Sequence, residues 1–114
     1  MDDQINFRLN VRVFQGEQPF LGKGRVQLLE RIEQLGSIAQ AAKSMGMSYR
    51  KAWGLIKEMN TIAQAPLVEK QPGGKSGGGA VVTEAGKAAI QKYQQLMQAL
   101  DIHLAQLAQE IRFL

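Results

Sequence analysis

Two glycines divide a stretch whose apolar residues recur at helical spacing into three short segments. Gly36 and Gly46 each follow residues whose apolar members recur every three or four positions, the period of one helix face. A glycine at this place is the usual end of a helix, because it adopts the left-handed backbone at no steric cost. The sequence therefore predicts three short helices in succession, which limits the fold to small arrangements that are mainly helical.

The second and third helices have the features of a helix-turn-helix, which we expect over residues 38–64. Alanines in the second helix are small enough for it to cross the third helix closely, and Gly46 provides the tight turn between them. Ser37 and Ser48 are the N-cap candidates, because a serine hydroxyl can accept a hydrogen bond from a free amide of the first turn. The apolar face of the third helix consists of Ala52, Ile56, Met59 and Ala63.

A β-hairpin is expected before the helices, over residues 5–21. Residues 5–14 alternate between apolar and polar side chains, which is typical of a half-buried strand. Residues 18–21 can return beside it, and Pro19 indicates that this second strand lies at an edge.

A second hairpin is expected after the helices, because residues 67–71 and 80–83 read as two short strands joined by a glycine-rich stretch. Three helices followed by such a ribbon are the arrangement of a winged helix-turn-helix. We therefore predict an α+β fold that is mainly α, with a DNA-binding domain over residues 1–83 and its wing over residues 67–83.

A long helix is predicted over residues 84–114, with Thr83 as its N-cap. Its apolar residues step by three and four without a break, which is the pattern of a coiled-coil seam. This seam can pack on the chain's own helices or against a second copy, and we expect a homodimer because three short helices cannot cover all of it. The predicted dimerisation residues are Ile90, Tyr93, Met97, Leu100, Leu104, Leu107 and Ile111.

The charge of the chain favours nucleic acid as a partner. The net charge is +4, and the stretch from Lys43 to Lys75 alone holds six basic and two acidic residues. Concentrated positive charge attracts phosphate backbones. The predicted contacts to double-stranded DNA are Ser48, Tyr49, Arg50, Lys51, Gly54 and Lys57 on the third helix, and Lys75 and Ser76 in the wing. Trp53 has two interpretations, packing in the core or a role near DNA.

Catalytic, metal and cofactor sites are not expected. There is no cysteine and a single histidine, His103, which lies beside the seam of the last helix. Zinc sites are built mainly from several cysteine and histidine ligands, and nucleophilic catalysis needs a nucleophile with a base beside it. Without such a constellation we do not expect an enzyme. The chain also has no signal peptide and no apolar stretch of about 20 residues, so we expect a cytoplasmic protein.

The stretches "GSIAQAAKSMGMSYRKAWGLIKEMN", "LVEK" and "GGKSGGGAVVTEAG" resemble the N-terminal DNA-binding domain of ModE-type molybdate-responsive regulators, which is similar to the winged helix of LysR-type regulators. The resemblance covers roughly residues 24–93. It implies DNA binding, dimerisation on a palindromic operator, and a part in molybdenum homeostasis. Such regulators carry oxyanion-binding domains after the long helix, and because this sequence ends at Leu114 we expect no molybdate site in it.

Two other functions remain open. A dimeric winged helix can serve as a protein-interaction module without specific DNA binding. The tripeptide Gly74-Lys75-Ser76 also matches the end of a nucleotide-binding phosphate loop. That loop requires a glycine where Glu69 stands and a helix that begins at the lysine, whereas here more glycines and a strand follow. The glycine-rich stretch is therefore interpreted as the tip of the wing, with Lys75 directed to a DNA phosphate.

Overall fold

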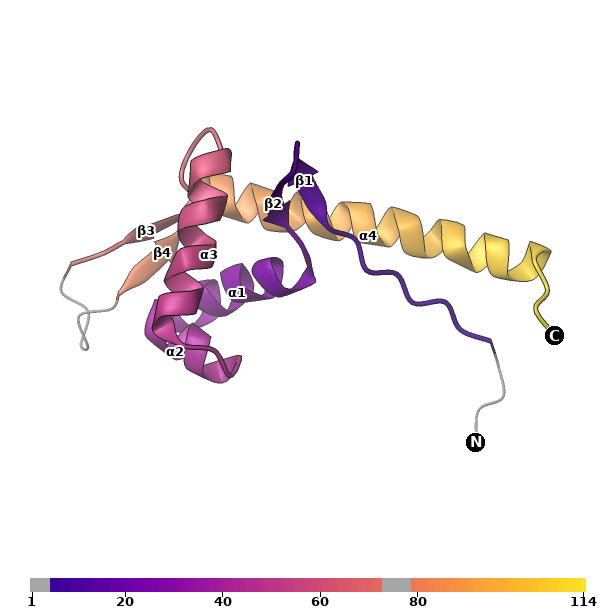
Figure 1. Ribbon diagram of the computed structural model, residues 1–114, viewed down its shortest axis with the longest axis horizontal. Coiled ribbons are helices and arrows are strands. Elements are labelled where there is room, and N and C mark those ends of the chain that lie inside the picture. The colour runs from indigo at the N-terminus through magenta and orange to yellow at the C-terminus, as the bar shows by residue number, and fades with distance from the viewer. Residues whose placement is uncertain (1–4, 73–78) are drawn as a thin grey trace.

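The structure is a computed structural model that describes residues 5–72 and 79–114 (Figure 1). Its elements in chain order are β1 (Val13–Gln15), β2 (Gln18–Leu21), α1 (Lys23–Leu35), α2 (Ile38–Ser44), α3 (Tyr49–Ile62), β3 (Val68–Lys70), β4 (Ala80–Val82) and α4 (Glu84–Glu110). The strands β1 and β2 form one antiparallel pair, and β3 and β4 form another. This arrangement confirms the predicted fold class, a mainly helical winged helix-turn-helix with an N-terminal hairpin and a long C-terminal helix.

The helix ends follow from the residues that the sequence places there. Gly36 and Gly46 have φ of 66° and 69°, the left-handed backbone that ends a helix. The Ser37 hydroxyl accepts a hydrogen bond from the Gln40 amide at 3.1 Å, and the Ser48 hydroxyl accepts one from the Lys51 amide at 3.1 Å. The predicted stops and caps are confirmed, so local chemistry sets the lengths of α1, α2 and α3.

The core lies where these three helices meet the wing. From α1 it takes Leu28, Leu29 and Ile32, from α2 Ile38, Ala41 and Ala42, and from α3 Ala52, Ile56 and Met59, all essentially inaccessible to solvent. The alanines leave room for α2 and α3 to lie close together, as expected of a helix-turn-helix. Val68 and Val82 close the core from the wing side.

The wing hairpin is held by hydrogen bonds at both ends of β4. At the tip end, the Ala80 amide donates to the Gly36 carbonyl at 3.1 Å, and at the base, the Thr83 hydroxyl donates to the Pro66 carbonyl at 2.6 Å. Gly86, in the first turn of α4, lies against the Leu67 carbonyl and the Val82 side chain. The start of α4 and the start of β3 are therefore in direct contact, and a side chain at position 86 has no space.

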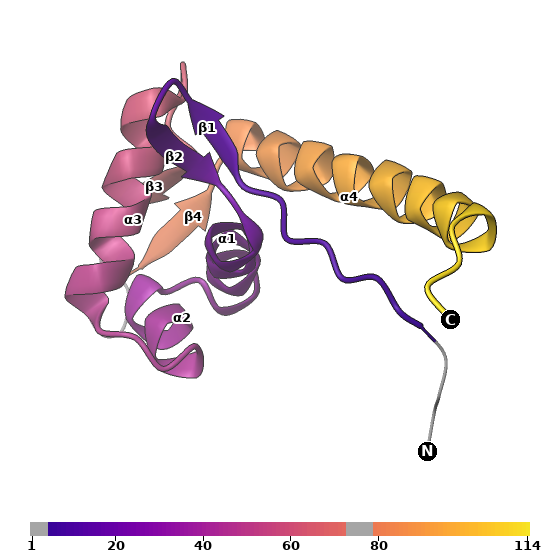
Figure 2. The same ribbon diagram turned by 45° about the vertical axis from the view of Figure 1, so that its right-hand side comes forward.

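The N-terminal segment differs from the expected strand. Only Val13–Gln15 pairs with β2, whereas residues 5–12 run extended beside α4 in the opposite direction (Figures 1 and 2). An alternating segment forms a strand only where a neighbour supplies hydrogen bonds, and the four-residue β2 can pair with three residues. The predicted half-buried strand over residues 5–14 is therefore wrong for most of its length. The segment is in contact with α4 and the C-terminal residues: the Tyr93 hydroxyl donates to the Val11 carbonyl at 2.8 Å, and the Phe7 and Phe113 rings meet edge to face.

The last helix is 27 residues long. Its first part lies against the helical core, and the rest extends away from the core (Figure 2). Its first three turns pack against α1 and β4, where Ala89, Ile90 and Tyr93 are buried. Its remaining turns extend past the core and have the N-terminal segment beside them. Among the described residues, no helix has the length and apolar character that crossing a membrane requires.

Gly86→Ala tests the close contact between α4 and the wing. The added methyl group would meet backbone atoms of Leu67, and overpacking of this kind costs about 2 kcal/mol of unfolding free energy. Gly24→Ala in α1 is the matched control, because its added carbon meets nothing within 4 Å and alanine is the better helix former. Urea unfolding of both variants should show a loss for Gly86→Ala alone. Equal stability of the two variants would contradict the contact.

Candidate nucleic-acid interface

Burial of one face of α3 determines which side chains the helix presents outward. Ala52, Ile56 and Met59 are inaccessible. With 3.6 residues per turn, positions 50, 54, 57 and 61 lie on the opposite side of the helix. Arg50 and Lys57 are exposed there, with Gly54 between them. This set is called the outer face: Arg50, Gly54, Lys57 and Thr61.

The outer face has no side chain at its centre, because residue 54 is glycine. A carbon added at this position would meet nothing within 4 Å, so packing in the free protein does not require glycine. Glycine inside a helix costs about 1 kcal/mol relative to alanine. A costly residue without a packing role is expected where another molecule approaches the backbone closely.

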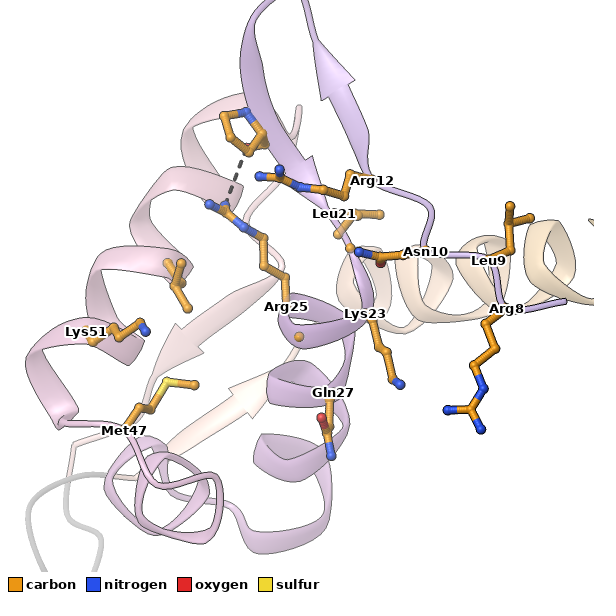
Figure 3. Close-up of a pocket in the computed structure, with 14 residues that line it drawn as sticks. Arg8, Leu9, Asn10, Arg12, Leu21, Lys23, Arg25, Gln27, Met47 and Lys51 are labelled. Carbon is orange, nitrogen blue, oxygen red and sulfur yellow. Dashed lines mark hydrogen bonds between the residues drawn. The ribbon is translucent and has the colours of Figure 1, made fainter. Parts of the chain in front are cut away.

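Ser48 and Lys51 lie away from the outer face, although the sequence analysis grouped them with Arg50. The Ser48 hydroxyl is engaged by the Lys51 amide as the N-cap of α3. The Lys51 side chain lies on a flank of the helix and lines an open cleft of about 680 Å³ between α3, α1 and the N-terminal segment (Figure 3). Neighbouring positions on a helix are 100° apart, and this rotation separates Arg50 from Lys51.

The same cleft gathers positive charge that, apart from Lys51, the sequence did not lead us to assign to a site. Its basic lining residues are Arg8, Arg12, Lys23, Arg25 and Lys51. One of them is paired, because the Arg25 guanidinium donates to Glu58 on α3 at 2.8 Å. Lys23 and Arg25 stand in the first turn of α1, where the helix dipole disfavours cations. Two cations in the first turn of a helix are therefore the sequence signal that could have indicated this basic cleft.

The opposite flank of α3 faces the wing and carries two aromatic rings. Tyr49 is 40% exposed, and Trp53 is half-buried against the core. The ammonium group of Lys70, at the end of β3, lies 4.0 Å from the centroid of the Trp53 ring and 5.8 Å from that of Tyr49. Trp53 therefore combines core packing with a contact to the wing, and Lys70 is a residue that the sequence analysis did not single out.

Asn60 links α3 to the start of β3 with its side-chain amide. Its Oδ1 accepts from the Leu67 amide at 2.8 Å and from the Val68 amide at 3.4 Å, and its Nδ2 donates to the Val68 carbonyl at 3.0 Å. One side chain thus satisfies backbone groups of a strand end that would otherwise have no partner. The glycine-rich tip of the wing, including the predicted contacts Lys75 and Ser76, lies outside the described residues.

The predicted dimerisation seam divides into two parts. Ile90 and Tyr93 are 6% and 7% exposed and pack within the chain, and Met97 packs at the edge of the same core. Leu100, Leu104 and Leu107 are half-buried, and Ile111 is exposed. The far part of the seam therefore retains apolar surface. Further apolar surface lies beside it on the N-terminal segment: Ile5, Phe7 and Leu9.

Comparisons with known proteins identify the helix-turn-helix and the wing. Residues 24–87 match the family described as bacterial regulatory helix-turn-helix protein, lysR family. The molybdenum-pterin-binding protein MopA of Rhodobacter capsulatus is 46% identical over 82 residues, which are 72% of this chain and 31% of that protein. The DNA-binding transcriptional dual regulator ModE of Escherichia coli (strain K12) is 48% identical over 79 residues, 69% of this chain and 30% of that protein. The chain thus spans about 30% of the length of these curated relatives.

Asn60→Ala tests the link between α3 and the wing. It leaves the Leu67 amide and the Val68 carbonyl without their partner, and we expect a loss of about 2 kcal/mol in unfolding free energy. Thr61→Ala is the neighbouring control, because the exposed Thr61 hydroxyl donates only to the Lys57 carbonyl of its own helix. Thermal unfolding followed by circular dichroism measures both variants. A loss for Asn60→Ala no larger than that for Thr61→Ala would contradict the assigned link.

Proposed function

Because the chain belongs to the lysR family of bacterial regulatory helix-turn-helix proteins, we propose that it binds DNA sequence-specifically as a homodimer through the outer face of α3. Family membership supports a DNA-binding transcriptional regulator. The observation that carries the finer proposal is the outer face itself. Arg50 and Lys57 flank the bare backbone at Gly54, on a helix whose opposite face is fully buried.

The outer face suits the major groove of DNA. That groove is about 12 Å wide and admits one α-helix. Arg50, in the first turn of α3, is assigned to base edges, because a guanidinium can donate two parallel hydrogen bonds to guanine. Lys57, two turns further on, is assigned to a backbone phosphate. Gly54 lets the helix backbone approach the groove, and Tyr49 stands at the edge of this contact on the wing side.

The wing is assigned to the DNA backbone beside the groove. Its strands leave the core next to α3, and its tip carries Lys75 and Ser76. Ser48 contributes by fixing the start of α3, and Lys51 extends the positive surface toward the basic cleft. Together these residues provide one half-site contact with sequence readout from α3 and sequence-independent attraction from the flanks.

The far part of α4 is assigned to the homodimer. Leu100, Leu104, Leu107 and Ile111 repeat at coiled-coil spacing beyond the core, where this chain covers them only in part. A second copy would cover this stripe and the apolar side chains of the N-terminal segment. Two-fold symmetry of the protein then matches a palindromic operator.

The regulated process is assigned from the relatives. Their names include molybdenum transport and molybdenum-pterin binding, and we propose a role in molybdenum homeostasis in the cytoplasm. The chain covers about 30% of the length of those proteins, and DNA binding is the activity that the proposal assigns to it.

A salt titration of duplex binding tests the proposed function. Fluorescence anisotropy of a labelled mixed-sequence duplex is measured at roughly 50 and 200 mM salt. A dimer that makes about six phosphate contacts should lose about 10³-fold in affinity across this range. Absence of salt-sensitive binding would reject DNA binding and favour a winged helix that binds a protein partner.

Gly54→Leu separates folding from DNA binding. A carbon added at position 54 meets nothing within 4 Å in the free protein, and leucine is the better helix former, so unfolding free energy should rise by up to about 1 kcal/mol. The same side chain would hold α3 away from the groove and lower DNA affinity by more than about tenfold, the effect of losing a single good base contact. Retained affinity in the anisotropy titration would exclude close approach at Gly54.

Leu100→Lys combined with Leu104→Lys tests the dimer interface. Two charges in an apolar seam should yield monomers in light scattering, because lysine ammonium groups are not desolvated without partners. Gln95→Lys combined with Gln106→Lys is the control, since it adds the same charge to exposed positions on the other side of α4. A dimer that survives the leucine substitutions, or that is lost equally in the control, would contradict the assignment.

A further inference from the structure

A lysine and two aromatic rings connect the end of β3 to the flank of α3. The Lys70 ammonium lies 4.0 Å from the centroid of the Trp53 ring, well inside the range of a cation–π contact, and 5.8 Å from that of Tyr49. Tyr49 and Trp53 are four residues apart, so they stand one above the other on the helix. Lys70 is the last residue of β3, and the wing tip follows it within a few residues.

This contact attaches β3 to α3 at the end opposite to Asn60. Asn60 holds the beginning of the strand through the Leu67 amide and the Val68 carbonyl. Of the three β3 residues, only Val68 is buried, while Glu69 and Lys70 are exposed. At the tip end of the hairpin, Ala80 pairs with Lys70 and donates its amide to the Gly36 carbonyl, which ties β4 to the turn between α1 and α2. The Lys70 contact adds a direct attachment of the same end of β3 to α3.

We propose that Lys70 and Trp53, with Tyr49, form a clamp that sets the position of the wing relative to the recognition helix. This inference rests on the proposed DNA-binding function. The clamp lets groove contacts by α3 and backbone contacts by the wing form together, because it holds the end of β3 beside α3 before DNA arrives. Lys70 and Trp53 are positioning residues in this account, whereas Lys57 contacts a phosphate directly.

A lysine bound to DNA would behave differently from a lysine in the clamp. Removing a phosphate contact lowers the slope of log affinity against log salt by about one unit. Removing one side of the clamp lowers affinity and leaves that slope unchanged. Removing the second side after the first should then have little further effect, because the interaction is already lost.

A double-mutant cycle with DNA affinity as the readout tests the clamp. Lys70→Met, Trp53→Leu and the double variant are titrated against the same duplex as the unmodified protein. We expect each single variant and the double variant to lose about tenfold, since all of them lack the same contact between β3 and α3. Lys70→Arg should restore binding, because a guanidinium also stacks on indole. Lys57→Met is the comparison, with a slope lowered by about one unit.

The fluorescence of the free protein gives a readout that needs no DNA. Trp53 is the only tryptophan in the chain, so its emission reports the clamp directly. Lys70→Met should increase acrylamide quenching of this emission, while Lys57→Met should leave it unchanged. Thermal unfolding of each variant shows whether the fold is intact.

The outcomes separate the clamp from the proposed function. Losses that multiply to about a hundredfold in the double variant, or a salt slope lowered by Lys70→Met, would overturn the clamp and make Lys70 a phosphate contact. Unchanged quenching in Lys70→Met would overturn it as well. Unmodified protein that binds no duplex would instead overturn the proposed function, and the clamp's role with it, whatever the quenching result.

Discussion

The burial of one face of α3 against α1 and α2 is the constraint on which the site depends. Ala52, Ile56 and Met59 occupy the centre of a small core, and they can do so in one rotation of the helix only. That rotation directs Arg50 and Lys57 outward. The core does not contact the partner, but it fixes the direction of the α3 side chains that we assign to DNA. Small residues in α2 make this possible, because larger ones would separate the two helices and weaken the burial.

The wing is held by a different kind of interaction. Val68 and Val82 contribute to the core, but the position of β3 beside α3 depends on the Asn60 amide and on Lys70 over Trp53. Hydrogen bonds and cation–π contacts of this kind contribute less than the burial of a helix face. The Ala80 amide adds a hydrogen bond to the Gly36 carbonyl, which ties the wing to the turn between α1 and α2. Binding is then sensitive to the few residues that join the wing to the helices.

Local chemistry could be predicted from the sequence, and long-range placement could not. Gly36, Ser37 and Ser48 define helix ends through contacts within four residues, so their roles follow from position alone. The alternation in residues 5–14 was misleading because a strand also requires a partner, and β2 is too short to be one. Lys70 and Trp53 are 17 positions apart in the sequence, and only the path of the chain between them brings them together. The seam of α4 was recognised, but its pattern does not show that Ile90 and Tyr93 are covered by the chain itself.

Selection of bound duplexes from a random pool, followed by sequencing, tests the central claim most directly. That claim is that two copies of the outer face of α3 read DNA bases in a fixed geometry. The account predicts an enriched motif of two inverted half-sites, with centres about one helical turn of DNA or a multiple of it apart. It also predicts that Arg50→Ala changes the bases preferred within each half-site. A pool without an enriched motif, or a motif without two-fold symmetry that Arg50→Ala leaves unchanged, would contradict it.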